Sequence, residues 1–186
     1  KIVDAPGLTE HLRYGPAYRA QTLATRLDFT QVGGFAGAVE QCNGAGACRK
    51  DGGGMCPSFQ ATREEEHSTR GRANLLRAAL SGALPAGALT SPRLHAALDL
   101  CLECKACQAE CPSAVDMAKL KYEFLAQYQA FHGVPLRSRR FAEIARVSAL
   151  ASAVAPIANA VLALPAIRWL NAQWLGIARQ RVFPRF

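Results

Sequence analysis

No stretch of the sequence alternates apolar and polar residues as a strand does, so little or no β-sheet is expected. Phosphate-binding loops of the G-x-G-x-x-G and Walker types are absent, and so are Ser/His/Asp and Cys/His catalytic sets. The four histidines are scattered, and His67, which follows the first cysteine segment, is expected to be an ordinary histidine. The sequence therefore predicts an all-α protein whose chemistry comes from its cysteines.

The sequence also lacks the features of a nucleic-acid-binding protein. Its formal net charge is +8, but the basic residues form no single run, and no zinc-finger, RNA-recognition or helix-turn-helix signature is present. We expect no nucleic-acid partner. Part of the positive charge is expected to offset a negatively charged metal site, and the rest to be solvated or to face an acidic partner domain.

An initiator Met and a signal sequence are missing as well. The chain begins Lys1-Ile2-Val3-Asp4, and we expect it to be a piece of a longer polypeptide. Its seven cysteines are clustered and odd in number, whereas a disulfide framework should leave none over and would need an exported chain. Metal ligation in a reducing cytoplasm is the better interpretation.

The second cysteine segment has the strongest motif. Cys101, Cys104, Cys107 and Cys111-Pro112 follow the pattern C-x2-C-x2-C-x3-C-P, which is typical of proteins that bind cubane [4Fe–4S] clusters. In two-cluster proteins the first three cysteines bind one cluster, and the fourth, turned away by the proline, completes the other. A zinc site is the rival interpretation, but zinc motifs usually pair two C-x2-C knuckles.

The first segment supplies the remaining ligands. Cys42 and Cys48 take the first and third positions of the same pattern, Ala45 stands at the second, and Cys56-Pro57 at the fourth. The pattern in which the fourth cysteine of each segment completes the other cluster is called the crossing rule below. It predicts one complete [4Fe–4S] cluster, bound by Cys56, Cys101, Cys104 and Cys107. It also predicts a second site one thiolate short, formed by Cys42, Cys48 and Cys111.

Three interpretations of the second site remain open. It can hold a [3Fe–4S] cluster, or a [4Fe–4S] cluster whose fourth iron takes an outside ligand or water. It can also hold no metal, its cysteines being small buried hydrophobic residues. A different wiring, with Cys42, Cys48, Cys56 and Cys111 around one cube, is less favoured because it leaves the other three cysteines underligated.

Three segments are expected along the chain. Residues 1–40 form an irregular lead-in from a preceding domain, residues 41–133 the cluster-binding helical domain, and residues 134–186 Pro-broken helices that pack on neighbouring domains. Helices are predicted after a Thr62 cap up to Gly82, from Ser91-Pro92 to the second cysteine segment, and from Ser113 and Asp116 to Gly133. The last of these carries an apolar stripe of Met117, Leu120, Phe124, Tyr128 and Phe131.

The stretch 147–167 carries no charge over 21 residues, which is long enough to span a membrane. Its content is nevertheless alanine-rich and contains Pro156, Asn159 and Pro165, which disfavour a span. Short helices broken at the prolines are expected instead. Trp169 and Trp174 suit an interface with a protein or with a membrane surface.

The run from Cys42 to Leu76, CNGAGACRKDGGGMCPSFQATREEEHSTRGRANLL, resembles the iron–sulfur part of fused FAD/iron–sulfur D-2-hydroxyacid dehydrogenases. That group contains bacterial D-2-hydroxyglutarate dehydrogenase and related D-lactate dehydrogenases. The tail from Pro135 to Phe186 is similar too, and Lys1-Ile2-Val3 looks like the end of the preceding flavin module. Ala45 departs from the pattern of full two-cluster relatives.

The resemblance implies a helical-ferredoxin domain in an oxidoreductase. A preceding FAD domain would take a hydride from a D-2-hydroxy acid, and electrons would leave through the cluster to a quinone or another electron carrier. A C-terminal cysteine-rich domain would follow, and the enzyme would be cytoplasmic, either free or at the inner face of the membrane. A non-redox structural module that anchors neighbouring domains, and a membrane-docked quinone-reducing subunit, are the alternatives.

Arg70 and Arg72 follow the first cysteine segment. One hypothesis is that one of them raises the cluster potential through its charge or through a hydrogen bond to a cluster sulfur. The other is that they form surface salt bridges with Glu65 or Glu66 on a helix.

Overall fold

The computed structural model describes residues 3–10 and 12–186 and divides the chain into two units after His132. Residues 1, 2 and 11 lie outside the described residues. Two of the three residues on which the resemblance at Lys1-Ile2-Val3 rests are therefore not described. All regular structure in the described part is helical, without a strand, which confirms the all-α prediction. The division falls one residue before the expected domain boundary.

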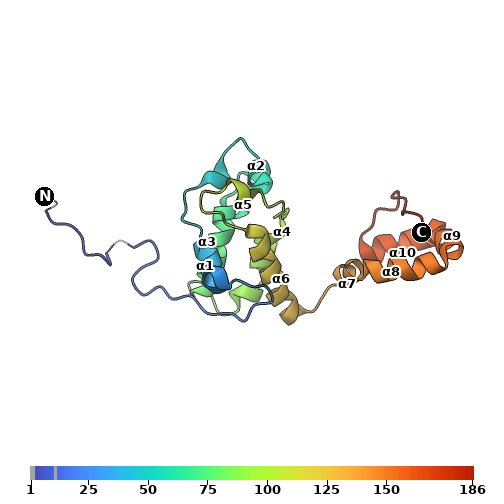
Figure 1. Ribbon diagram of the computed structural model, residues 1–186, viewed down its shortest axis with the longest axis horizontal. Helices are drawn as coiled ribbons and strands as arrows, with labels where there is room; N and C mark the ends of the chain where they lie inside the picture. The colour runs from blue at the N-terminus through green and yellow to red at the C-terminus, as the bar shows by residue number, and fades with distance from the viewer. Residues whose placement is uncertain (1–2, 11) are drawn as a thin grey trace. The chain divides into compact units, whose positions relative to one another are not determined.

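The first unit contains six α-helices and several short 3-10 turns (Figure 1). The helices are α1 (Gly34–Glu40), α2 (Pro57–Thr62), α3 (Thr69–Leu80), α4 (Pro92–Asp99), α5 (Ala106–Glu110) and α6 (Met117–His132). The 3-10 turns are η1 (Thr30–Val32), η2 (Ala47–Arg49), η3 (Glu65–His67) and η4 (Ala88–Thr90). Helix α3 packs against α1, α4 and α6, and the fully buried side chains of Val39, Leu76, Leu98 and Phe124 form the core between them.

The lead-in is not irregular throughout, because residues 34–40 form helix α1. Phe35, Ala38 and Val39 have the spacing of one helical face, and all three are buried, so packing on α3 stabilises this short helix. The preceding segment is anchored on α6. The buried carboxylate of Glu123 accepts hydrogen bonds from the backbone N–H of Arg26 at 2.9 Å and of Leu27 at 3.0 Å.

Two of the three predicted helix starts are observed. The Ser91 hydroxyl accepts from the Leu94 N–H at 3.2 Å and begins α4, and the Asp116 carboxylate accepts from the Lys119 N–H at 2.9 Å and begins α6. The apolar stripe of α6 is buried at Met117, Leu120 and Phe124. It does not reach Phe131, which is 73% exposed near the end of the helix.

The predicted start at Thr62 was wrong. Thr62 ends α2, and α3 begins seven residues later with Ser68 as its cap, whose hydroxyl accepts from the Gly71 N–H at 2.9 Å. The reason is that η3 folds back over the first turn of α3. A Cβ atom at position 71 would lie only 1.9 Å from the Glu65 carbonyl oxygen. Only glycine allows this approach.

Replacing Gly71 by alanine should therefore destabilise the first unit by about 1–3 kcal/mol, because the backbone of η3 must move to admit the methyl group. Denaturant unfolding of the metal-loaded protein measures the loss. Gly52→Ala is the matched control, since a Cβ atom there meets nothing within 4 Å. Equal stability of the two variants would contradict the close approach.

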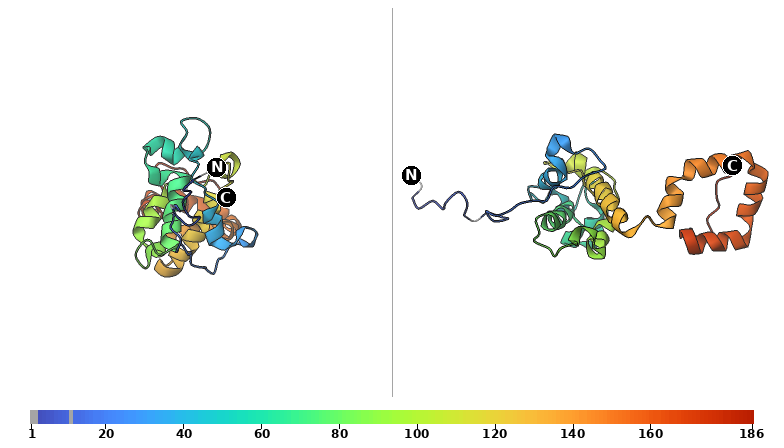
Figure 2. Two further views of the ribbon diagram at one scale, coloured as in Figure 1. Left: turned by 90° about the vertical axis from the view of Figure 1, so that its left-hand side faces the viewer. Right: turned by 90° about the horizontal axis from the view of Figure 1, so that it is seen from below.

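The second unit, Gly133–Phe186, contains α7 (Leu136–Ala142), α8 (Ile144–Ala153), α9 (Ala155–Ala163) and α10 (Pro165–Leu175). The helices follow one another around a ring, with α10 packed against α7 and the C-terminal segment across the middle (Figure 2). Pro156 and Pro165 lie in the first turns of α9 and α10, where proline is tolerated. None of the described residues in these four helices is buried.

No single helix of the described chain has the length and apolar character needed to cross a membrane. Only α8 and α9 taken together meet that test, and they are bent by 111° at their junction.

The second unit also holds most of the net charge. It contains eight arginines and a single acidic residue, Glu143. Most of the excess charge thus lies in a different unit from the cysteines. The expectation that part of the charge offsets a metal site therefore concerns a few individual basic side chains near the cysteines, which are described below.

Candidate metal centre

Four cysteines from two distant segments line one cavity, which we call the first cavity. They are Cys56 from the first segment and Cys101, Cys104 and Cys107 from the second. The cavity encloses about 300 Å³ of space, part of it open to solvent, and Cys104 is its exposed member. These are the residues that the crossing rule assigns to one [4Fe–4S] cluster.

Cys56 reaches this cavity through an unusual backbone conformation. Its φ of 57° lies in the left-handed region, which few residues other than glycine adopt, and Pro57 begins α2 directly afterwards. The preceding glycine-rich loop is fixed by Glu110, whose carboxylate accepts from the N–H of Gly54 at 2.9 Å and of Met55 at 3.1 Å. Glu110 belongs to α5, between Cys107 and Cys111, so it joins the two cysteine segments.

The loop that carries Cys101 and Cys104 is fixed by Lys121 of α6. The buried ammonium group donates to the carbonyl oxygens of Asp99 at 3.1 Å and Cys101 at 2.8 Å, and it pairs with Glu103 at 3.0 Å. Glu103 and Lys105 both have positive φ angles, of 56° and 61°. Left-handed residues within a turn bring successive backbone N–H groups to one side, and such a group of donors favours a bound anion.

Burial is the main influence on the pKa of two thiols of the first cavity. It raises the pKa of Cys101 and of Cys107, and N–H donors oppose it in part: Glu103 donates to Cys101, and Met117, the first residue of α6, donates to Cys107. Thiols with a raised pKa stay protonated at neutral pH unless a metal ion displaces the protons. The donor set thus suits a metal ligated by thiolates.

Arg72 provides the observation that tests this fit. Its side chain is 1% exposed, lines the first cavity and donates to Ala97 O at 3.0 Å, His67 O at 2.6 Å and Ser58 Oγ at 3.0 Å. Its Nη1 also donates to Cys56 Sγ, at 3.9 Å. Within the described residues it forms no ion pair with a carboxylate. Buried charges are normally paired, and an anionic group held by the four thiolates would supply the missing counter-charge.

The remaining three cysteines line a second cavity of about 280 Å³. Cys42, Cys48 and Cys111 surround it, and Ala45 lies in its wall where the pattern would place a cysteine. Burial raises the pKa of Cys48, and the Arg70 N–H, which donates to Cys48 Sγ at 3.3 Å, opposes this in part. The structure thus brings together the two groups of cysteines that the sequence predicts.

The two cavities lie on either side of the first turn of α3. Thr69 lines the second cavity, while its hydroxyl lies 3.4 Å from Cys56 Sγ of the first. Cys56 also contributes to the raised pKa of Cys48, although the two thiols line different cavities. The N-terminus of α3, which favours negative charge, faces both groups of sulfur atoms.

The two arginines differ in their surroundings. Arg70 forms the salt bridge that the alternative hypothesis expected, with Nε at 2.7 Å and Nη2 at 3.0 Å from the Glu65 carboxylate. Arg72 forms none in the described chain and faces the first cavity instead. The hypothesis that an arginine tunes the complete cluster therefore becomes specific to Arg72.

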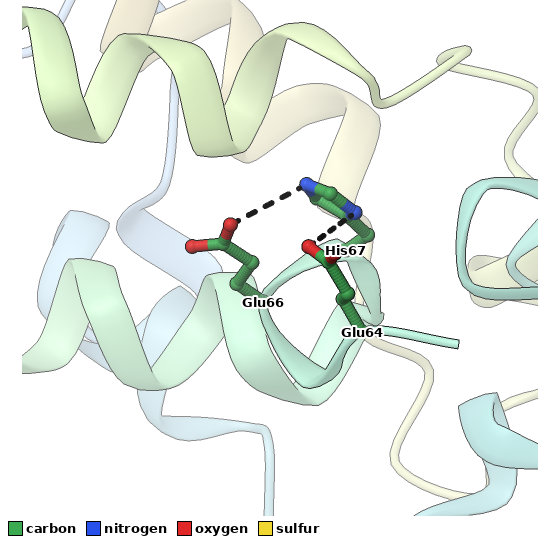
Figure 3. A group of neighbouring side chains, drawn as sticks. All are labelled: Glu64, Glu66 and His67. Atoms are coloured by element: carbon green, nitrogen blue, oxygen red, sulfur yellow. Dashed lines mark ion pairs between the residues drawn. The ribbon is translucent and has the colours of Figure 1, made fainter. Parts of the chain in front are cut away.

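His67 lines neither cavity. Its imidazole lies between two carboxylates, with Nδ1 3.6 Å from Glu64 and Nε2 3.6 Å from Glu66 (Figure 3). Nδ1 also lies 2.9 Å from the Thr62 hydroxyl, and Glu66 is shared with Arg93. The three ligand atoms are close enough to hold a metal ion, but these contacts already account for them as an ion-pair network.

Comparison with known proteins agrees with this geometry. Residues 38–115, which include all seven cysteines, match the family described as the 4Fe-4S dicluster domain. This segment is therefore similar to 4Fe-4S dicluster domains, and we call it the dicluster segment. It begins within α1 and ends before Asp116, and it contains the first turn of α3 and every residue that lines the two cavities except Ala118.

Most of the chain is similar to three curated enzymes, each named D-2-hydroxyglutarate dehydrogenase. The Pseudomonas putida protein is 28% identical over 82% of the chain, the Escherichia coli protein 25% over 95%, and the Pantoea ananatis protein 28% over 69%. The chain spans about a fifth of the length of these relatives, 16–21%. No solved structure matches it.

Sequence reasoning missed two residues, Lys121 and Glu110, that position the cysteines of the dicluster segment. Lys121 was detectable in principle, since it lies four residues after Met117 and three before Phe124, on the buried face of α6. A lysine on such a face requires partners. Glu110 gave no comparable signal, because acidic residues are common in exposed turns.

Proposed function

We propose that this chain is the electron-transfer part of a larger FAD-dependent D-2-hydroxyacid dehydrogenase. The substrate would be a D-2-hydroxy acid such as D-2-hydroxyglutarate or D-lactate, and the acceptor a quinone or another electron carrier. A bound [4Fe–4S] cluster would supply one-electron redox chemistry in the first cavity. The observation that carries the proposal is Arg72, a buried cation that lines the cavity of the four cysteines and has no carboxylate partner among the described residues.

The residues of the chain would do three things. Cys56, Cys101, Cys104 and Cys107 would ligate the cluster. Backbone N–H groups of Glu103 and Met117 would donate to the ligand sulfurs and stabilise their negative charge. The first turn of α3, which contacts sulfur atoms of both cavities, would connect the two sites over a short distance.

The full-length protein tests this proposal under anaerobic conditions. Adding D-2-hydroxyglutarate should produce the EPR signal of a reduced cluster within one turnover, whereas the L-enantiomer should not. The alternative is a structural module whose cluster only holds the helices together. It predicts that the cluster stays oxidised while an artificial acceptor is reduced at the full rate.

For the second unit we propose packing against other domains of the same polypeptide. Its helices leave large apolar side chains exposed, including Phe141, Trp169 and Trp174, and it bears eight arginines. An acidic, partly apolar domain surface would suit both features. The relatives are about five times longer than the chain, so they contain further domains for this contact.

Vesicle flotation of the full-length protein separates this contact from membrane docking. We expect the protein to remain unbound with neutral and with anionic vesicles alike, in keeping with a cytoplasmic enzyme. Salt-sensitive flotation with anionic vesicles alone would instead assign the second unit to the membrane surface.

Arg72→Gln should lower the midpoint potential of the cluster in the first cavity, because a positive charge that stabilises the reduced form is lost. The expected change is about 1–2 kcal/mol, on the order of 50–100 mV for a one-electron couple. An EPR-monitored redox titration measures it. Arg70→Gln is the control, since it removes a charge of the same size from a residue that does not line the first cavity. Equal potentials in both variants would rule out a tuning role for Arg72.

A further inference from the structure

The second cavity has three cysteine ligands and a defined position for the one that is missing. In the second segment Cys101, Cys104 and Cys107 are separated by two residues each, and Cys42, Ala45 and Cys48 repeat this spacing in the first. Ala45 lines the cavity together with its flanking cysteines. The side without a ligand is therefore the side of Ala45.

None of the other described side chains that line the cavity can replace the thiolate. The Asn43 side-chain oxygen already accepts from the Ala45 N–H at 2.9 Å, and the Thr69 hydroxyl lies 3.4 Å from Cys56 Sγ. The others are Gly46, Ala47 and Val115, which carry no ligand atom, and Arg70, which is a cation. The residues fit three iron corners of a cluster but not a fourth.

The guanidinium of Arg70 lies against the segment that contains Ala45. Its Nη1 donates to the Gly44 carbonyl oxygen at 3.3 Å, and a Cβ atom on Gly46 would lie 3.0 Å from the same nitrogen. The bidentate pair with Glu65 holds the group there. A fixed positive charge at this side opposes the binding of another cation.

We infer that the second cavity holds a three-iron [3Fe–4S] cluster, not the four-iron cluster that the family description names. This rests on the proposed function. A three-iron cluster lacks one ferrous ion of the four-iron cluster and so carries less positive charge. When both are bound by the same three thiolates, the three-iron cluster is the more negative. The Arg70 guanidinium and the N-terminus of α3 both favour the more negative form.

The test is EPR spectroscopy with iron and sulfide analysis of anaerobically prepared full-length protein. An oxidised three-iron cluster is paramagnetic, whereas an oxidised four-iron cluster of the ordinary type is EPR-silent. The wild-type protein should give the three-iron signal before any reductant is added. Cys42→Ser should abolish that signal and leave the cluster of the first cavity in place.

Ala45→Cys supplies the missing ligand and should convert the site. We expect almost complete loss of the three-iron signal, and a gain in iron without a gain in sulfide. A wild-type protein that is EPR-silent when oxidised, with iron for two complete cubes, would overturn the inference in favour of an outside ligand. Iron for one cube only, unchanged by Cys42→Ser, would overturn it in favour of an empty site. A protein with no iron in either cavity would instead refute the proposed function.

Discussion

Cys56→Ser should abolish the four-iron cluster, although Cys56 lies 45 residues before the C-x2-C-x2-C motif. Cys111→Ser should leave that cluster intact, although Cys111 belongs to the motif. The reason is the crossed arrangement of the two cavities. Cys56 lines the cavity of Cys101, Cys104 and Cys107, whereas Cys111 lines that of Cys42 and Cys48.

Iron content and the EPR signal of the reduced protein measure both effects. Cys56→Ser should remove the reduced four-iron signal almost completely, and with it reduction of the acceptor. In Cys111→Ser the same signal should stay near the wild-type level, so each variant is the control for the other. The reverse outcome, with Cys111 required and Cys56 dispensable, would show that the four cysteines of the second segment ligate one cluster by themselves.

The two groups of cysteines were predictable because ligand spacing is a local property of the sequence. Three cysteines with two residues between each pair are placed to bind the same cluster. The proline after the fourth cysteine turns the chain away from that cluster. Spacing alone could not show which remote cysteine completes the first site. The crossing rule supplied that, and the structure brings Cys56 to the predicted cavity through its left-handed backbone.

The errors lie where tertiary contacts decide the local structure. Residues 34–40 have too short an apolar pattern to form a stable helix alone, and only burial against α3 makes them helical. The start of α3 depends on the approach of Gly71 to the Glu65 carbonyl, a contact that caps and propensities do not reveal. Phe131 fits the α6 stripe by spacing, but the core ends before it reaches that turn.

The assignment of charge shows the same limit. The net charge of +8 does not tell how the charge is distributed, and most of the excess lies in the second unit. Near the cysteines individual side chains supply positive charge, among them Arg70, Arg72 and Lys121. Each is fixed by partners distant in sequence or by a neighbouring turn, so position and not composition determines their effect.

Lys121→Met should have the largest effect on stability among substitutions outside the cysteines. The ammonium group satisfies two carbonyl oxygens and the Glu103 carboxylate, and its side chain is 7% exposed. Methionine preserves most of the volume but leaves all three acceptors without their donor. Unsatisfied buried acceptors are costly, and we expect a loss of about 2–4 kcal/mol in the free energy of unfolding.

The same substitution should loosen the first cavity, because Lys121 fixes the carbonyl of Cys101 and the side chain of Glu103. Iron should therefore pass from the first cavity to a chelator several-fold faster. The second cavity, whose cysteines are not among the contacts of Lys121, should lose iron at the wild-type rate. Lys50→Met is the control, since Lys50 is exposed and lines neither cavity. If Lys121→Met were as stable as this control and released iron at the same rate, the loop of Cys101 and Cys104 would keep its conformation without Lys121. Selective loss from the first cavity would show that a lysine on α6 keeps its cysteines in place.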